Sequence, residues 1–280
     1  MKLRPRGLPQ GWYPGRAEEC RLEIESFSDY IQGVKLDPAR PRGGVIPHAG
    51  WFFSGRLAAL VFHLCSRKKL PDVVVLFGGH LGFGPGIIYA DQAWETPFGP
   101  LEMDQDLAKA LAAQSNVRPE GPLNNDNTVE IQVPLVKYYF PQSRLLALRA
   151  PQTQEAIELG RLVAALSKEQ GKTIMAFGSS DLTHYGPNYG FSPQGAGSKA
   201  LSWVRKNNDK GFIDLALAMD GPGLLDHAAR NMSACSAGAV AAAAAACAAQ
   251  GSTKGMLADY YTSYDIMPGD SFVGYAGIVY

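Results

Sequence analysis

The sequence predicts an α/β protein with a three-layer α/β/α arrangement and a mixed central sheet. Apolar runs rich in β-branched residues, such as VVVLF at 73–77, are typical of buried strands, and segments with helical periodicity lie between them. This alternation is typical of α/β folds. The last two strand-like runs, 255–264 and 271–280, have no helix between them, so part of the sheet should be antiparallel.

The composition limits the class of protein. A chain of 280 residues is long for one domain but within the range of α/β domains, so we expect one domain over 1–280. Lys plus Arg and Asp plus Glu are both 26, and the charges are interspersed. We therefore expect no nucleic-acid partner and no membrane surface.

The cysteines give no sign of a disulfide framework. Cys20, Cys65, Cys235 and Cys247 lack CxxC spacing, which argues against a zinc ribbon and favours a reducing compartment. The basic amino terminus is not followed by the apolar run of a secretory signal. The most apolar window, 235–249, is shorter than the ~20 residues that cross a bilayer. We expect a soluble, cytoplasmic protein.

The amino-terminal half should begin with an extended arm rich in Pro and Gly. Apolar periodicity and turn residues then predict, in order, a helix over 17–32, a strand beginning at 44–47, a helix over 54–67 with Ser54 as N-cap, strands over 71–80 and 87–94, and a helix over 104–114.

The carboxyl-terminal half should repeat this alternation. The pattern predicts a helix over 128–140 capped by Asn127 or Thr128, a strand over 143–148, a helix over 153–170, a strand over 173–177, a mostly helical stretch over 193–223, and an Ala-rich helix starting at Cys235 with Asn231 or Ser233 as cap. Pro134 should kink its helix unless that helix begins later.

One stretch, FGSSDLTHYG at 177–186, combines a strand end with chemical groups. If a helix starts after the two serines, Asp181 and His184 lie on one face of its first turn and form a candidate acid/base pair. In open α/β sheets the carboxyl ends of strands are where ligands bind. The alternative is that Asp181 is an N-cap and His184 a surface residue.

Two more histidines follow predicted strands, His48 in PHAG and His80 in FGGH, and Cys235 stands at a predicted helix start. Two imidazoles and a thiolate suit iron, copper or zinc better than magnesium or calcium. A helix amino terminus would lower the thiol pKa and present thiolate to a metal. The alternative is that the histidines bond within their turns and Cys235 is a small apolar helix residue.

Other residues are candidates for roles around such a site. Asp181 or Glu130 could orient an imidazole and fix its tautomer. Trp51, Phe52 and Tyr185 could stack on an aromatic substrate or a peptide side chain, or could belong to the core. We assign no residue to an organic cofactor.

Several segments together resemble the Memo family in order and spacing. They are GWYPG, VIPHAGWFFSG, LFGGH, NDNTVEIQVPLV, GSSDLTHYG, the Cys235 segment and GYAGIVY, and they extend over nearly the whole chain. Bacterial members of this family are called AmmeMemoRadiSam system protein B. Memo proteins are similar to the catalytic subunits of class III extradiol dioxygenases, which hold non-haem Fe(II) with two histidines and a carboxylate. The resemblance therefore implies a class III extradiol dioxygenase-like fold.

The resemblance also implies roles for residues. It makes His48, His80 and Cys235 metal ligands, with cysteine where the dioxygenases have glutamate, and it makes His184 and Asp181 the catalytic acid/base pair. Asn127 stands where the family usually has a histidine. We place Asn127 with Glu130, Trp51 and Tyr185 around the metal or in the substrate pocket. Ser236 replaces the glycine that commonly follows the cysteine.

The expected function follows from this ligand set. We expect Fe(II) or copper, with zinc as an alternative, in a dioxygenase-like oxidoreductase acting on a small molecule, and the bacterial family name implies radical-SAM and AMMECR-type protein partners. A thiolate is softer and more easily oxidised than a carboxylate, which argues against extradiol cleavage itself. The alternatives are a metal-independent scaffold that binds peptides in a phosphotyrosine-type manner, as the resemblance to animal members implies, and a zinc hydrolase.

Overall fold

The computed structural model describes residues 2–121 and 126–280. Its main feature is a nine-stranded sheet with the order β10-β12-β2-β9-β3-β8-β4-β7 and with β11 paired to β12. These strands are β2 (Gly43–Ile46), β3 (Val73–Gly78), β4 (Ile87–Ile88), β7 (Arg118–Pro119), β8 (Arg144–Arg149), β9 (Ile174–Ser179), β10 (His184–Tyr185), β11 (Met256–Thr262) and β12 (Phe272–Val279).

The sheet is mixed, as predicted. Strands β2, β9, β3 and β8 are parallel neighbours, whereas β12 runs antiparallel to β2 and to both β10 and β11. The central strands β3 and β9 are buried along their whole length, which explains their continuous apolar sequences. A smaller three-stranded sheet joins β1 (Leu3–Arg4), β5 (Ala93–Trp94) and β6 (Leu101–Glu102).

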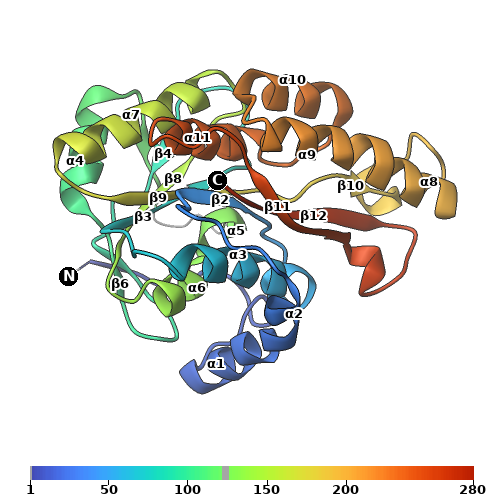
Figure 1. Cartoon of the computed structure of the whole chain (residues 1–280), viewed down its shortest axis with the longest axis horizontal. Helices are drawn as coiled ribbons and strands as arrows, with labels where there is room; N and C mark the ends of the chain where they lie inside the picture. The colour runs from blue at the N-terminus through green and yellow to red at the C-terminus, as the bar shows by residue number, and fades with distance from the viewer. Residues whose placement is uncertain (1, 122–125) are drawn as a thin grey trace.

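Helices cover both faces of the main sheet, which confirms the three-layer prediction (Figure 1). One face packs against α1 (Ala17–Ser26), α2 (Ser28–Gly33), α3 (Arg56–Ser66) and α6 (Val133–Tyr139). The other packs against α4 (Gln105–Gln114), α7 (Glu155–Glu169), α9 (Asp209–Leu217), α10 (Gly221–Asn231) and α11 (Ala237–Ala248). The short helix α8 (Ser198–Trp203) continues through a π-helical turn, η3 (Val204–Asn208), into α9.

Two predicted helix starts differ from the structure. The helix expected from Ser54 already begins with a π-helical turn, η1 (Trp51–Gly55), and the Ser54 hydroxyl donates to the carbonyl of Ala49 at 3.1 Å instead of capping. The helix expected over 128–140 is split into α5 (Asn127–Glu130) and α6. Pro134 lies in the first turn of α6, where a missing N–H leaves no hydrogen bond unmade.

Two further predictions around the site were wrong. No helix follows Ser180, because residues 184–185 form β10 and pair with β12. The Ala-rich helix α11 starts at Ala237 with Ser236 as its N-cap residue, so Cys235 lies just before the helix. Neither predicted cap serves it: Asn231 belongs to α10, and the Ser233 hydroxyl contacts His227 Nδ1 at 2.7 Å.

The Ala-rich sequence of α11 is explained by close packing. A Cβ atom at Gly160 of α7 would clash with the backbone of Ala242, and one at Gly178 of β9 would clash with the backbone of Ala239 and Val240. Only small side chains allow α11 to approach both elements this closely. Within residues 2–121 and 126–280, no helix is long and apolar enough to cross a membrane.

This packing gives a test of the fold. Gly160→Ala should lower the free energy of unfolding by about 3 kcal/mol, because the added methyl meets backbone that cannot rotate away. Gly33→Ala is the control, since a Cβ there meets nothing within 4 Å. The control should be neutral or slightly stabilising. Equal denaturation midpoints for both variants in urea would contradict the packing described here.

Candidate metal centre

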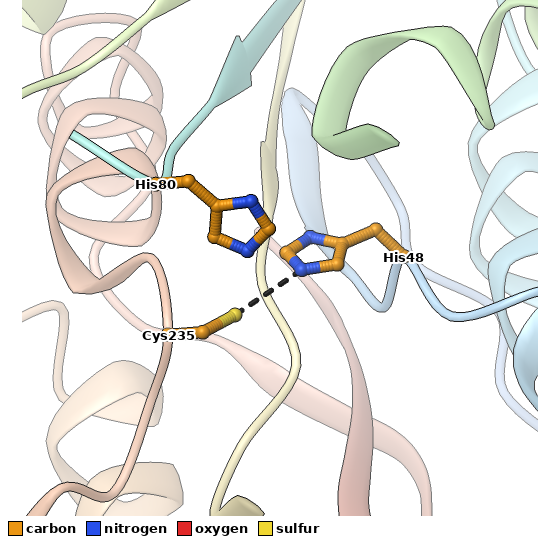
Figure 2. A group of neighbouring side chains, drawn as sticks. All are labelled: His48, His80 and Cys235. Atoms are coloured by element: carbon orange, nitrogen blue, oxygen red, sulfur yellow. Dashed lines mark hydrogen bonds between the residues drawn. The ribbon is translucent and has the colours of Figure 1, made fainter. Parts of the chain in front are cut away.

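The predicted site residues lie at one edge of the sheet. His48 follows β2, His80 follows β3, and Asp181 follows β9, and these three strands are adjacent and parallel. Their carboxyl ends therefore meet at the same edge. Cys235 comes from the segment before α11, and its side chain points toward the two imidazole rings (Figure 2).

The three side chains bring nitrogen and sulfur donors together. Cys235 Sγ lies 3.1 Å from His48 Nε2, and the two histidine ring centroids are 5.0 Å apart at an angle of 83°. One donor atom from each of His48, His80 and Cys235 lies within 4.8 Å of the other two. This spacing is compatible with one metal ion contacting all three donors, because metal–nitrogen and metal–sulfur bonds are about 2.0–2.3 Å long.

Three contacts fix the orientation of His48. Its backbone N–H donates to Asp181 Oδ1 at 2.7 Å, and its carbonyl accepts from Asn127 Nδ2 at 2.8 Å. The ring Nδ1 is 3.3 Å from the Ser179 hydroxyl, which leaves Nε2 facing Cys235. The His48 side chain is buried.

His80 has a constrained backbone with φ at 56°, in the left-handed region that costs a non-glycine residue about 1–2 kcal/mol. Hydrogen bonds hold it there: its N–H donates to Ser236 Oγ at 3.3 Å, and Arg149 donates to the carbonyls of Gly79 at 2.9 Å and His80 at 3.4 Å. Its Nδ1 lies 3.1 Å from Asp126 Oδ2, so its Nε2 remains for a metal.

Asp126 is a site residue that the sequence reasoning missed. It pairs with His80, lies 3.4 Å from Arg149, and caps α5 by accepting from the Thr128 N–H at 3.0 Å. Arg149 also pairs with Glu120 at 3.0 Å. The signal is the Asp in NDNT, directly before the predicted helix; the predicted caps, Asn127 or Thr128, lie one or two residues after the observed cap.

Cys235 is held by its backbone. Its N–H donates to the carbonyl oxygen of Asp181 at 3.2 Å, and its own carbonyl accepts from Gln152 Nε2 at 2.7 Å. The sulfur also lies 3.8 Å from the Ser180 hydroxyl and 3.6 Å from the Ser236 hydroxyl. The thiol therefore faces a polar environment, unlike the core cysteines Cys20, Cys65 and Cys247.

The thiolate form of Cys235 and the protonated forms of His48 and His80 stabilise one another electrostatically. Burial raises the pKa of Cys235, but the His48 charge and hydrogen bonds from His48 and His80 outweigh burial and hold the pKa well below its ordinary value. Burial also lowers the pKa of His48, yet the neighbouring Cys235 and Asp181 raise it to about 9. The hydrogen bond to Asp126 is the main reason that the pKa of His80 rises to about 10.

Asp181 and His184 form the expected pair without a helix. The distance between Asp181 Oδ2 and His184 Nε2 is 3.9 Å, and Asp181 is buried whereas His184 is partly exposed. The His184 ring stacks on Tyr189 with centroids 4.9 Å apart. The neighbouring Thr183 anchors this segment by donating its N–H to the buried Asp209 at 3.1 Å.

A cavity of about 710 Å³ opens beside the cluster. It is lined by His48, His80, Asp181 and His184 together with Gln10, Gly11, Trp12, Ala49, Gly50, Phe52, Phe53, Asn127, Asn188, Tyr189, Ser263, Met267, Ser271, Val273 and Tyr275. Such a mixture of aromatic surface with a few polar groups is typical of small-molecule sites.

Three residues predicted around the metal or substrate have other roles. Trp51 is 2% exposed and donates its Nε1 to the carbonyl of Ile131, and Tyr185 is 1% exposed and stacks on Phe272. Both belong to the core and do not line the cavity. Glu130 touches neither imidazole, because its carboxylate accepts from the amino-terminal arm.

Comparison with known proteins confirms the family that the sequence motifs predict. A family model described as Memo-like protein matches residues 6–279. The chain belongs to the Memo-like family. Its curated relatives include MEMO1 family proteins of Methanosarcina barkeri, 30% identical over 275 residues, and of Methanococcoides burtonii, 32% identical over 273 residues. Each of these two alignments covers 96% of this chain and 96% of the relative.

Among solved structures, an uncharacterised protein of Escherichia coli K12 has a similar fold. Its TM-score is 0.50 at 14% sequence identity, and the match covers 78% of this chain and 91% of that one. At this identity the likeness concerns the fold alone, and it agrees with the predicted α/β class.

Asp126 provides a test of the centre. Because a carboxylate bonded to the far nitrogen of a ligating histidine strengthens the ligand, Asp126→Asn in this Memo-like protein should weaken metal binding about 10- to 100-fold. Competition against a chromophoric chelator measures this. Asp220→Asn is the matched control, since Asp220 also caps a helix, α10, by accepting from the Gly223 N–H. An equal loss of affinity in both variants would remove Asp126 from the centre.

Proposed function

We propose that this Memo-like protein binds one iron or copper ion and uses it for redox chemistry on a small organic molecule. The observation that carries the proposal is the convergence of His48, His80 and Cys235, whose donor atoms lie within 4.8 Å of one another. Two imidazole nitrogens and one sulfur suit a transition metal and do not suit magnesium or calcium, which prefer oxygen.

The surroundings of these donors fit a metal ion. Each imidazole has its Nδ1 beside an oxygen, the Ser179 hydroxyl for His48 and the Asp126 carboxylate for His80, which directs Nε2 of both rings toward Cys235. Metal-ligating histidines are held in this way. His48 and His80 also line the cavity, so positions on the ion remain open to a ligand.

Bound there, the ion would supply Lewis-acid and redox chemistry, and the protein's residues would do the rest. His184 Nε2 would accept or donate a proton at the cavity wall, with the buried Asp181 fixing its orientation. Phe52, Trp12 and Tyr189 offer aromatic faces to an organic ligand. The remaining wall contributes amide and hydroxyl groups from Asn127, Asn188, Ser263 and Ser271.

The absence of lysine and arginine among the described residues of the cavity wall favours a small molecule over a phosphorylated peptide. None of the described residues that line it is lysine or arginine, and Asp181 is its one carboxylate. Phosphate recognition ordinarily uses arginine clusters, which form bidentate hydrogen bonds. A phosphotyrosine-type ligand would have no such partner here.

The metal itself is the first test. Protein purified without chelator should contain close to one equivalent of iron or copper by elemental analysis, and Cys235→Ser should lose most of it, because the hydroxyl is a poorer donor than thiolate. Cys247→Ser is the control, since that thiol is buried in the core, where it donates to the backbone carbonyls of Arg42 and Ala176. Unchanged metal content in Cys235→Ser would exclude the thiol as a ligand. Zinc as the sole metal, with hydrolysis sustained by zinc, would favour a hydrolase.

A second test concerns the reaction. The iron-loaded protein should not open the ring of protocatechuate at ordinary enzymatic rates, on the order of 1 per second, because a soft, oxidisable thiolate replaces the usual carboxylate. Oxygen consumption and product absorbance report this directly. Ring opening at such a rate by the unaltered protein would refute the argument from the thiolate, whereas its appearance only in Cys235→Glu would support it.

A further inference from the structure

The amino-terminal arm forms part of the cavity wall although it is remote in sequence from the other lining residues. Gln10, Gly11 and Trp12 line the cavity, and the Trp12 carbonyl accepts from the Trp51 N–H at 2.9 Å. The arm thus lies against the segment that follows His48. A ligand larger than a few atoms at the metal would meet this wall.

Residues 7–13 of the arm donate several hydrogen bonds to the carboxylate of Glu130. Its Oε1 accepts from the N–H groups of Gly7 at 3.0 Å and Leu8 at 2.8 Å and from the Tyr13 hydroxyl at 3.2 Å, and its Oε2 lies 3.1 Å from the Gly7 nitrogen. Glu130 is 4% exposed. A buried carboxylate is stable only when such donors replace water, so the arm and Glu130 depend on each other.

Arg6 completes this arrangement within the arm itself. Its guanidinium stacks on the Tyr13 ring at 4.0 Å and donates to the carbonyls of Leu8, Pro9 and Tyr13 at 3.1, 3.2 and 2.8 Å. These contacts curl residues 7–13 into a compact turn. Glu130, from α5, ties both sides of that turn to the rest of the protein by side-chain hydrogen bonds.

The helix that carries Glu130 also borders the metal centre. α5 begins at Asn127, which lines the cavity and donates to the His48 carbonyl, and it is capped by Asp126, which bonds His80. One short helix therefore positions both histidines at its start and the arm at its end. Because α5 contacts both, the arm wall of the cavity is held in a fixed position relative to His48 and His80.

We infer that Glu130 is a positioning residue that sets ligand selectivity at the proposed metal centre by holding the wall formed by Gln10, Gly11 and Trp12. The inference rests on the proposed function. Glu130 touches neither the metal ligands nor the cavity, so it acts through the arm. Replacing it by glutamine removes the negative charge and puts an NH₂ group opposite the Gly7 N–H, which lies 3.1 Å from Oε2, so the hydrogen bonds that hold the arm become weaker.

The experiment uses Co(II)-loaded protein and two ligands of different size, imidazole and 4-phenylimidazole. Imidazole reaches only the open metal position, whereas the phenyl group extends into the cavity. In the unaltered protein 4-phenylimidazole should bind about tenfold more tightly than imidazole, because its ring is buried against the walls. Glu130→Gln should bring this ratio close to one and leave the imidazole affinity and the cobalt–thiolate absorption unchanged.

Three further variants separate the wall from its support. Trp12→Ala removes wall surface and should lower the ratio as Glu130→Gln does. Glu95→Gln is the matched control, because exposed Glu95 also accepts from the arm, at the Arg6 N–H at 3.2 Å, but outside residues 7–13. Glu95→Gln should keep the ratio of the unaltered protein. Glu130→Asp retains the carboxylate, so its affinity ratio should lie between those of Glu130→Gln and the unaltered protein.

Amide hydrogen exchange tests the support without ligand. Exchange over residues 7–13 should accelerate in Glu130→Gln and stay unchanged in Glu95→Gln. An unchanged ratio or unchanged exchange in Glu130→Gln would overturn the positioning role while the metal site stands. Absence of cobalt–thiolate absorption in the unaltered protein would instead refute the metal site, so the two failures are distinguishable.

Discussion

The buried Asp181 ties together the three segments of the centre. Its carboxylate accepts the His48 N–H at 2.7 Å and lies 3.9 Å from His184 Nε2, and its carbonyl accepts the Cys235 N–H at 3.2 Å. Burial opposes ionisation of Asp181, but its two histidine neighbours outweigh burial and lower its pKa. Because a buried carboxylate is costly unless it is bonded, these contacts are mutually dependent. The turn after β2, the turn after β9 and the start of α11 are thereby held as one unit.

The close approach of the end of β3 to α5 and to the Cys235 segment is the second constraint on the centre. A Cβ at Gly78 would overlap the Thr128 side chain, and one at Gly79 would overlap Ser236. The glycine pair thus lets the end of β3 approach α5 on one side and the Cys235 segment on the other. His80 then turns its ring between them through its left-handed backbone. The sequence LFGGH therefore needs glycine at 78 and 79, because any larger side chain there would keep β3 from packing this closely against α5 and the Cys235 segment.

The sequence alone predicted the features that depend on local pattern. Continuous apolar runs identified β3 and β9, and the rule that parallel strands end at one edge placed His80 and Asp181 there. Features that depend on distant partners were not accessible. Glu130 bonds residues 117 to 123 positions away, and β10 exists because His184 pairs with Val273. The direction of the Trp51 and Tyr185 side chains likewise depends on core contacts that no local pattern shows.

The departure at Asn127 narrows the chemistry that the cavity can perform. At the position where the resemblance to the family implies a histidine, the Asn127 amide donates to the His48 carbonyl at 2.8 Å, so it orients the turn that carries His48. An amide side chain does not act as a general acid or base near neutral pH, whereas an imidazole does. Among the described residues that line the cavity, the histidines are His48, His80 and His184, and the first two face Cys235. In the proposed function, proton transfer to or from a bound ligand would therefore depend on His184, held by Asp181 and stacked on Tyr189.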